Sequence, residues 1–301
     1  MEIIPREVQK LIEEREKLRR AKRYKESDAL REKIEALGYE LRDAPEGTEV
    51  SKTEEYTAPK KSSLVLFGSG EISATGARIH NSVFEKMEKD EISIAVISTP
   101  AGFQPNVKVV YEEIAEFFVE HLANYHPKID IIYANTKEQA NDPRVFYPLD
   151  TADYIFTGPG SPTYAIDHLR NTLLCEKIGE RVAAGVTLSL ASAATIAFSH
   201  FALPVYEIYK VGTPLHWKEG LNFYPPFFQE LTIIPHFNNR EGGKKTDTSH
   251  CYMGKERFET LFQMLPPQEH VWGIDEHTAA IVDLKTKQVR SMGKGKLRQL
   301  R

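Results

Sequence analysis

From residue 63 onward, short runs of β-branched and other apolar residues alternate with segments that show helical periodicity. The strand-like runs lie at residues 63–68, 92–98, 129–133, 153–157 and 186–190. Continuous apolar strands separated by helices indicate a parallel sheet that is covered on both faces. We therefore predict a doubly wound, mostly parallel α/β domain, in which ligands bind beyond the carboxyl ends of the strands.

The residues before this domain have a different composition. Residues 1–43 are rich in Glu, Lys, Arg and Leu, and two apolar stripes at helical spacing, one containing Val8 and the other Ile34, predict a small helical hairpin. Residues 44–62 are polar and contain prolines, which is typical of a linker. We expect three parts: the hairpin, this linker and an α/β domain at 63–301.

Composition excludes several classes of protein. The 301 residues include 39 Lys+Arg and 43 Asp+Glu, and the net charge of -4 argues against a protein that mainly coats nucleic acid. Two cysteines, Cys175 and Cys251, are too few for a disulfide framework, and we expect no metal and no other cofactor. The N-terminus has no leader-like apolar region, and no stretch approaches the roughly 18 to 20 apolar residues of a membrane span. We expect a cytoplasmic protein without membrane contact.

A basic cluster surrounds the expected break of the hairpin. Seven Lys and Arg residues lie between Arg15 and Lys25, with glutamates among them. The usual role of such a charge run is a solvated helix face. A phosphate-binding patch is the alternative.

The hairpin resembles the C-terminal tail of cysteinyl-tRNA synthetases. The resemblance covers about 40 residues in the same order, at segments 11–16, 21–22, 27–32, 37–41 and 43–48. The rest of the chain does not resemble that enzyme, which excludes synthetase activity. The resemblance implies a borrowed helical module. We favour packing within or between chains, with tRNA contact through Arg15–Lys25 as the alternative.

Two strand-to-helix turns of the α/β domain carry candidate chemistry. In the turn 158–163, Ser161 is suited to cap a helix and Pro162 to begin it. In the turn 190–195, Ser192 can project its hydroxyl above the sheet, as a nucleophile elbow does. Capping of the following helix is the more common role of such a serine.

Two further segments carry a histidine and a pair of acids. His236 follows a strand-like run, although a lone histidine is usually structural or lies on the surface. Asp275 and Glu276 lie between apolar strands. Either one of them orients a histidine, or both are solvated turn residues.

Together, these segments make residues 63 to about 295 resemble the peptidase E and cyanophycinase family. This family is a serine-hydrolase branch of the class I glutamine amidotransferase-like fold. Residues 158–163 match its oxyanion loop, 185–193 its nucleophile strand and turn, 235–237 its histidine segment, and 273–279 its acidic segment.

The resemblance implies a serine-type hydrolase of peptide or amide bonds. Ser192 would be the nucleophile, His236 the general base and acid, and Glu276 the carboxylate that orients the imidazole. The backbone N–H groups of Gly160 and Ala193 would form the oxyanion hole. Glutamine hydrolysis by a thiolate is not expected, because the elbow carries serine.

Substrate contacts are less well defined by the sequence. Family members act on peptide bonds next to aspartyl groups, whose carboxylate an arginine can bind. The aromatic segments 216–217 and 223–228 would either wall the cleft or cover a contact in a homo-oligomer, which we expect. The candidate substrate-binding residues are Ser161, Asn238, Arg240 and Asp275.

Three residues depart from the family pattern. Leu190 and Ala194 replace glycines on either side of the serine, and Leu190 would relax the elbow or fill the space that a substrate needs. Pro159 has no N–H to donate. The alternative function is therefore a catalytically weak or inactive binding protein with this fold, linked to tRNA through its hairpin.

Overall fold

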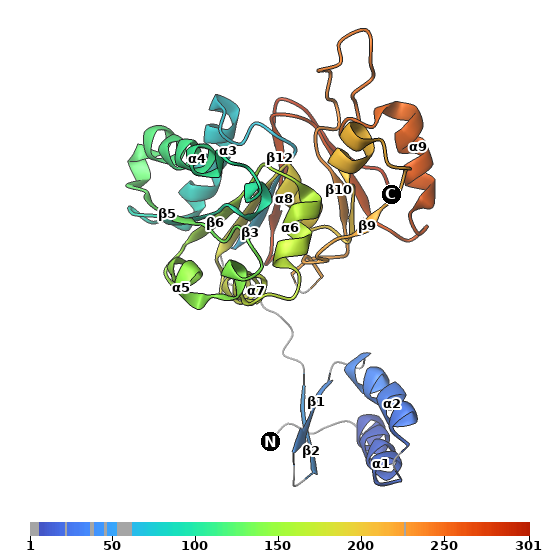
Figure 1. The fold of residues 1–301 in the computed structure, drawn as a ribbon. Helices are drawn as coiled ribbons and strands as arrows, with labels where there is room; N and C mark the ends of the chain where they lie inside the picture. Colours follow the sequence, from blue (N-terminus) through green and yellow to red (C-terminus); the bar gives the residue numbers. More distant parts are fainter. Residues whose placement is uncertain (1–5, 22, 37–38, 45–46, 53–61, 226) are drawn as a thin grey trace. The chain divides into compact units, whose positions relative to one another are not determined.

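The computed structural model describes residues 6–21, 23–36, 39–44, 47–52, 62–225 and 227–301. The chain divides into two compact units, Met1–Tyr56 and Thr57–Arg301, which Figure 1 displays. Within the described ranges, every helix is too short or too polar to cross a membrane.

The N-terminal unit combines two helices with a β-hairpin. Its elements are α1 (Arg6–Arg20), α2 (Tyr24–Ala36), β1 (Tyr39–Ala44) and β2 (Gly47–Lys52). The predicted helical hairpin is confirmed. Val8, Ile34 and Leu41 form its buried core, with Leu11 and Ile12 packed against them. The apolar stripes of the helices are therefore covered within their own unit.

The β-hairpin was not expected from the sequence. β1 and β2 pair antiparallel with Leu41 opposite Val50, so β2 occupies residues that we assigned to the linker. The two strands consist mostly of polar and charged residues, so the sequence pattern did not predict them. Leu41 of β1 supplies the apolar surface on which Val8 and Ile34 of the helices pack. Residues 53–61, the remainder of the predicted linker, lie outside the described residues.

A seven-stranded sheet forms the centre of the second unit. Its strand order is β13-β12-β3-β7-β6-β4-β5. The five strands from β3 to β5 run parallel to one another, and β12 pairs antiparallel with both of its neighbours, β3 and β13. All five strand-like runs of the sequence form strands of this sheet, which confirms the doubly wound α/β prediction. The strands are β3 (Ser63–Phe67), β4 (Ser93–Ile97), β5 (Lys128–Ile132), β6 (Tyr154–Thr157), β7 (Thr187–Ala191), β12 (Thr278–Asp283) and β13 (Val289–Gly293).

Helices lie on both sides of the sheet (Figure 1). On one side, residues of α3 and α4 share an apolar core with Phe67, Val96 and Phe156 of the strands. The α-helices of this unit are α3 (Ala74–Phe84), α4 (Val107–His121), α5 (Pro143–Phe146), α6 (Pro162–Leu169), α7 (Leu173–Ala183), α8 (Ala193–Ala197) and α9 (Gly254–Met264). Short 3₁₀ turns connect them at Glu85–Met87, Thr99–Ala101, Ala123–Tyr125, Gln139–Asn141 and Tyr147–Asp150.

Smaller elements complete the unit beside the main sheet. A three-stranded sheet contains β10 (Thr232–Ile234), β11 (Val271–Ile274) and β14 (Leu297–Gln299), and a two-stranded sheet contains β8 (Phe201–Ala202) and β9 (Lys218–Glu219). Between β8 and β9 lies the π-helix η6 (Glu207–Val211).

The aromatic segments identified in the sequence, 216–217 and 223–228, place several of their rings in the interior, whereas His216 is exposed. Phe223, Tyr224 and Phe227 are buried, and Trp217 donates its indole N–H to the carbonyl of Leu261 at 2.8 Å. These side chains pack within the unit and do not wall the pocket described below.

Candidate active site

Ser192 occupies the sharp turn between β7 and α8. Its backbone has φ 50° and ψ -109°, a conformation that non-glycine residues seldom adopt and that marks a strained turn. Its side chain makes no capping hydrogen bond to α8. Instead, its Oγ lies 2.9 Å from Nε2 of His236. The more common capping role of such a serine is therefore wrong for Ser192.

His236 and Glu276 continue this hydrogen-bond chain. His236, which follows β10, places Nδ1 2.9 Å from Oε1 of Glu276, and Asn239 donates to the same oxygen at 2.8 Å. The hydrogen bond with His236 lowers the pKa of Glu276, and the Asn239 bond adds to this effect, while partial burial opposes it. An ionised carboxylate can only accept hydrogen bonds. Nδ1 of His236 therefore donates to Glu276, and in the neutral ring Nε2 is the acceptor that faces the Ser192 hydroxyl.

The neighbouring acid Asp275 has a structural role. It is buried, pairs with the guanidinium of Arg298 and accepts a hydrogen bond from the backbone N–H of Lys296 at 2.9 Å. These contacts attach the loop that precedes β12 to strand β14 and the residue before it. Asp275, a substrate-binding candidate from the sequence, therefore lies outside the pocket described below, with its carboxylate held by Arg298 and Lys296.

Three other candidates for substrate binding also lie outside the pocket lining. Ser161 caps α6, with its Oγ accepting from the N–H of Tyr164 at 3.2 Å, and Pro162 begins that helix as predicted. Asn238 accepts from the backbone N–H of Glu276 at 2.8 Å and so holds the acidic loop. Arg240 is exposed on the loop after His236. The substrate-binding role expected for these three residues stays a prediction.

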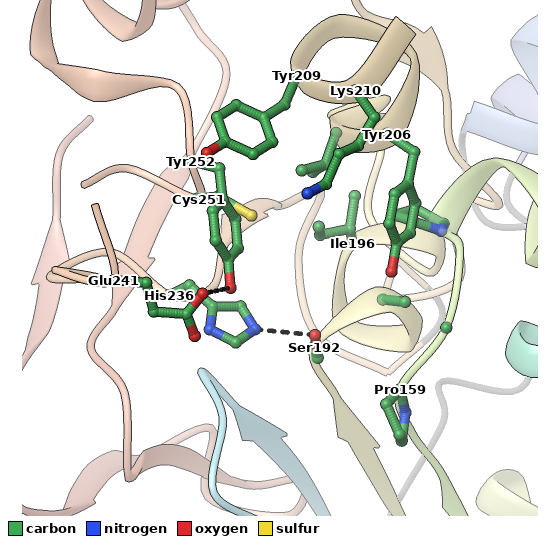
Figure 2. Close-up of a pocket in the computed structure, with 14 residues that line it drawn as sticks. Pro159, Ser192, Ile196, Tyr206, Tyr209, Lys210, His236, Glu241, Cys251 and Tyr252 are labelled. Carbon is green, nitrogen blue, oxygen red and sulfur yellow. Dashed lines mark hydrogen bonds between the residues drawn. The ribbon is translucent and has the colours of Figure 1, made fainter. Parts of the chain in front are cut away.

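A pocket of about 330 Å³ opens over Ser192 and His236 (Figure 2). Gly160 and Ala193, the predicted oxyanion-hole residues, both line it. Gly160 has φ 147°, and a Cβ atom there would lie 2.0 Å from the carbonyl oxygen of Pro100, so only glycine fits. Ala193 is the first residue of α8, where a backbone N–H has no acceptor within the helix.

The residues that depart from the family pattern do not obstruct this pocket. Leu190 is completely buried in β7, beside Leu66 of β3 and Thr157 of β6, and is absent from the pocket lining. Ala194 is also buried. The expectation that Leu190 fills the substrate space is therefore wrong, whereas Pro159 does form part of the pocket wall.

An aromatic group that we did not identify from the sequence forms the outer wall. The rings of His236 and Tyr252 lie 5.8 Å apart, and those of Tyr252 and Tyr209 lie 5.4 Å apart. Tyr252 donates its hydroxyl to Glu241 at 3.0 Å, and the Lys210 ammonium lies 5.1 Å from the Tyr209 ring centre. Tyr209 and Lys210 belong to η6. No sequence pattern identifies a π-helix, and these residues do not follow a strand of the main sheet, so the sequence analysis missed them.

The basic cluster of the N-terminal unit is only partly available at the surface. Arg15 is completely buried, so it offers no surface for the phosphate contact that was the alternative role of this cluster. Lys17 and Arg23 are exposed, and Arg23 pairs with Glu26 through a hydrogen bond of 2.7 Å. Lys22 lies outside the described residues.

Comparison with solved structures places the second unit among the peptidases by fold. A peptidase from an acI-B1 actinobacterium superposes with a TM-score of 0.58 at 20% identity, covering 79% of this chain and 97% of that one. A candidate peptidase E protein from Listeria monocytogenes EGD-e gives 0.52 at 16% identity, covering 78% and 99%. The second unit has the fold of peptidase E-type proteins.

The N-terminal unit has a separate set of relatives. Residues 2–50 match the family model of the cysteinyl-tRNA ligase anticodon binding domain. The cysteine–tRNA ligases of Methanosarcina mazei and Methanosarcina acetivorans are 52% and 54% identical to this chain over 54 residues. The match covers 18% of this chain and 11% of each ligase, so the chain spans about a tenth of these relatives.

Proposed function

We propose that the second unit is a serine-type hydrolase of peptide or amide bonds. The observation that carries the proposal is the continuous hydrogen-bond chain from Ser192 through His236 to Glu276, at the base of an open pocket. The likeness in fold to peptidases supports the same class, although a fold alone does not specify an activity.

The proposed reaction follows from the protonation of the three side chains. Nε2 of His236 takes the hydroxyl proton while Oγ of Ser192 attacks the carbonyl carbon of the substrate. The N–H groups of Gly160 and Ala193 stabilise the oxyanion, and loss of one such donor costs about 10² to 10³ in rate in related chemistry. His236 then protonates the leaving amine. Water, deprotonated by the same imidazole, releases the acyl group from Ser192.

The negative charge of Glu276 supports this reaction through its effect on the His236 ring. Its carboxylate holds the His236 ring in the tautomer that leaves Nε2 unprotonated. It also stabilises the imidazolium that forms when Ser192 loses its proton. Asn239 fixes the carboxylate by its second hydrogen bond.

The test is hydrolysis of a panel of dipeptides, isoaspartyl peptides and simple amides by the wild-type protein and by Ser192→Ala. We expect turnover that falls to background in Ser192→Ala and remains in Ser82→Ala, a change of a serine on α3 away from the pocket. Hydrolysis that persists in Ser192→Ala would remove Ser192 from the mechanism. A wild-type protein that cleaves nothing in the panel would favour the alternative, an inactive binding protein.

We further propose that the N-terminal unit contacts tRNA. The match of residues 2–50 to an anticodon binding domain supports this second function. Lys17 and Arg23 are exposed cations on this unit, whereas the buried Arg15 contributes to its interior. The chain would then join a hydrolase to a tRNA-binding module.

A further inference from the structure

The pocket beside Ser192 has a largely apolar wall. Ile196 lies four residues after Ser192 and accordingly on the same side of α8, and it is 2% exposed. Val205, Pro159 and Pro162 add further apolar surface to the lining. A wall of this kind favours apolar substrate groups, because they lose little hydration free energy when they leave water.

Three tyrosines enlarge this wall. Tyr206 lies just before η6, is 42% exposed, and extends along the pocket toward Ser192 and Pro159 (Figure 2). Tyr209 and Tyr252 contact one another at 5.4 Å between ring centres, on the side of His236. Ring separations of 4.5 to 7 Å are those at which aromatic groups attract each other. A flat substrate group therefore finds aromatic partners on two sides.

The charges at the pocket do not favour an acidic substrate group. Apart from His236, the described lining residues include one cation, Lys210, and one anion, Glu241, and both are exposed. Burial raises the pKa of the Cys251 thiol and of the Tyr206 hydroxyl, which keeps both groups neutral. Arg240, the cation that we expected to bind an aspartyl carboxylate, does not line the pocket.

We propose that this pocket takes an aromatic or bulky apolar group of the substrate beside the scissile bond, in preference to an acidic one. The inference rests on the proposed hydrolase function, since it assumes that the acyl group is held next to Ser192. It assigns a substrate class different from the aspartyl peptides that the family resemblance suggests.

Boronic acids test this preference without a known substrate. The boron atom accepts an oxygen lone pair of Ser192 while the hydroxyl proton passes to His236, so the adduct holds its side group in the pocket. We would compare 2-phenylethylboronic acid with 2-carboxyethylboronic acid as competitors of a fluorophosphonate that labels Ser192. We expect the phenyl compound to halve the labelling rate at a concentration that is lower than that of the carboxyl compound by a factor of about ten or more. Differences of this size are typical of apolar groups in apolar pockets.

Variants assign the preference to the tyrosine wall. Tyr206→Ala is expected to weaken the binding of the phenyl compound several-fold and to leave the binding of the carboxyl compound unchanged. Tyr147→Ala, at an exposed tyrosine outside the pocket lining, is expected to change neither. Equal or tighter binding of the carboxyl compound, with Ser192 labelled normally, overturns this inference alone. Failure of the fluorophosphonate to label Ser192 overturns the proposed hydrolase function and this inference with it.

Discussion

Two adjacent acids, Asp275 and Glu276, have different surroundings and hence different roles. Glu276 faces the imidazole of His236 and the amide of Asn239, and its side chain is half-buried. Asp275 points into the protein, where it is buried and paired with Arg298. Their substitution therefore separates a catalytic from a structural effect.

We predict that Glu276→Gln lowers the rate of Ser192 phosphonylation by about 10³ to 10⁴, because the neutral amide cannot stabilise the imidazolium. The measurement is the second-order rate of fluorophosphonate labelling. Asp275→Asn is the control. It should leave the labelling rate of the folded protein near that of wild type and lower the thermal midpoint, because Arg298 loses its buried partner. A larger loss of labelling in Asp275→Asn would reverse the assignment.

Sequence patterns located the residues of this site that belong to motifs, and missed those that do not. Ser192, His236 and Glu276 each follow a strand in a recognisable segment, so their meeting was expected. The different surroundings of Asp275 and Glu276 were not evident, because periodicity does not reveal which way neighbouring residues of one loop face. Tyr206 and Tyr252 come from segments without a motif, and only the tertiary structure brings them to the pocket.

At the scale of elements, helix α3 is tied to the sheet by a buried histidine. His80 has Nδ1 2.8 Å from the hydroxyl of Tyr154 in β6 and Nε2 3.1 Å from the carbonyl oxygen of Glu71, in the loop after β3. Burial lowers the pKa of His80 to about 3. The folded protein therefore holds this imidazole neutral, whereas the unfolded chain binds a proton below its ordinary pKa of about 6.5.

This difference predicts an acid-sensitive contribution to stability. Because the folded pKa of His80 is depressed, its contribution is fully present above about pH 6.5 and is lost as the pH falls toward 3. The slope is at most about 1.4 kcal/mol per pH unit for one group. His80→Gln should be less stable at pH 7 and lose this part of the pH dependence. Unfolding can be followed by the fluorescence of Trp217 and Trp272, both in the second unit.

The exposed His121 provides the comparison for His80. His121→Gln should keep the wild-type dependence of unfolding on pH, since its side chain is exposed and is not held between α3 and the sheet as His80 is. An unchanged slope in His80→Gln would show that other groups cause the loss of stability in acid.

The sequence also predicted some elements far better than others, for physical reasons. The parallel strands are buried on both faces, so their continuous apolar runs were unambiguous. β1 and β2 are short and polar, and Leu41 alone reveals that they belong to a core. The π-helix η6 has no periodicity that distinguishes it from a loop.

On the scale of the whole molecule, the chain contains two units that resemble different proteins. One has the fold of peptidase E-type proteins, and the other matches the anticodon binding domain of cysteinyl-tRNA ligase. Among the described residues of the N-terminal unit, Val8 and Ile34 of the helices are buried against Leu41 of its own β-hairpin.

We predict that the full-length protein retains tRNA and that its affinity falls steeply with salt, by about 0.9 log units per log unit of salt for each phosphate neutralised. Lys17→Glu should weaken this binding. Lys108→Glu, the same charge change at an exposed site on α4, should not. The affinity can be measured at two salt concentrations by the fluorescence anisotropy of labelled tRNA. Equal weakening by both variants, or no binding at low salt, would contradict a specific contact through the N-terminal unit.

The most direct test of the account is the covalent labelling of Ser192 by a fluorophosphonate, followed by intact mass and peptide mapping. We predict one added phosphonyl group on Ser192, lost in Ser192→Ala and strongly slowed in His236→Gln. His200→Gln is the matched control, because His200 also pairs with a carboxylate, Glu269, at 2.8 Å but lies outside the pocket lining. Absence of the label, or labelling of Ser192 at an undiminished rate in His236→Gln, would contradict the proposed catalytic role of these residues.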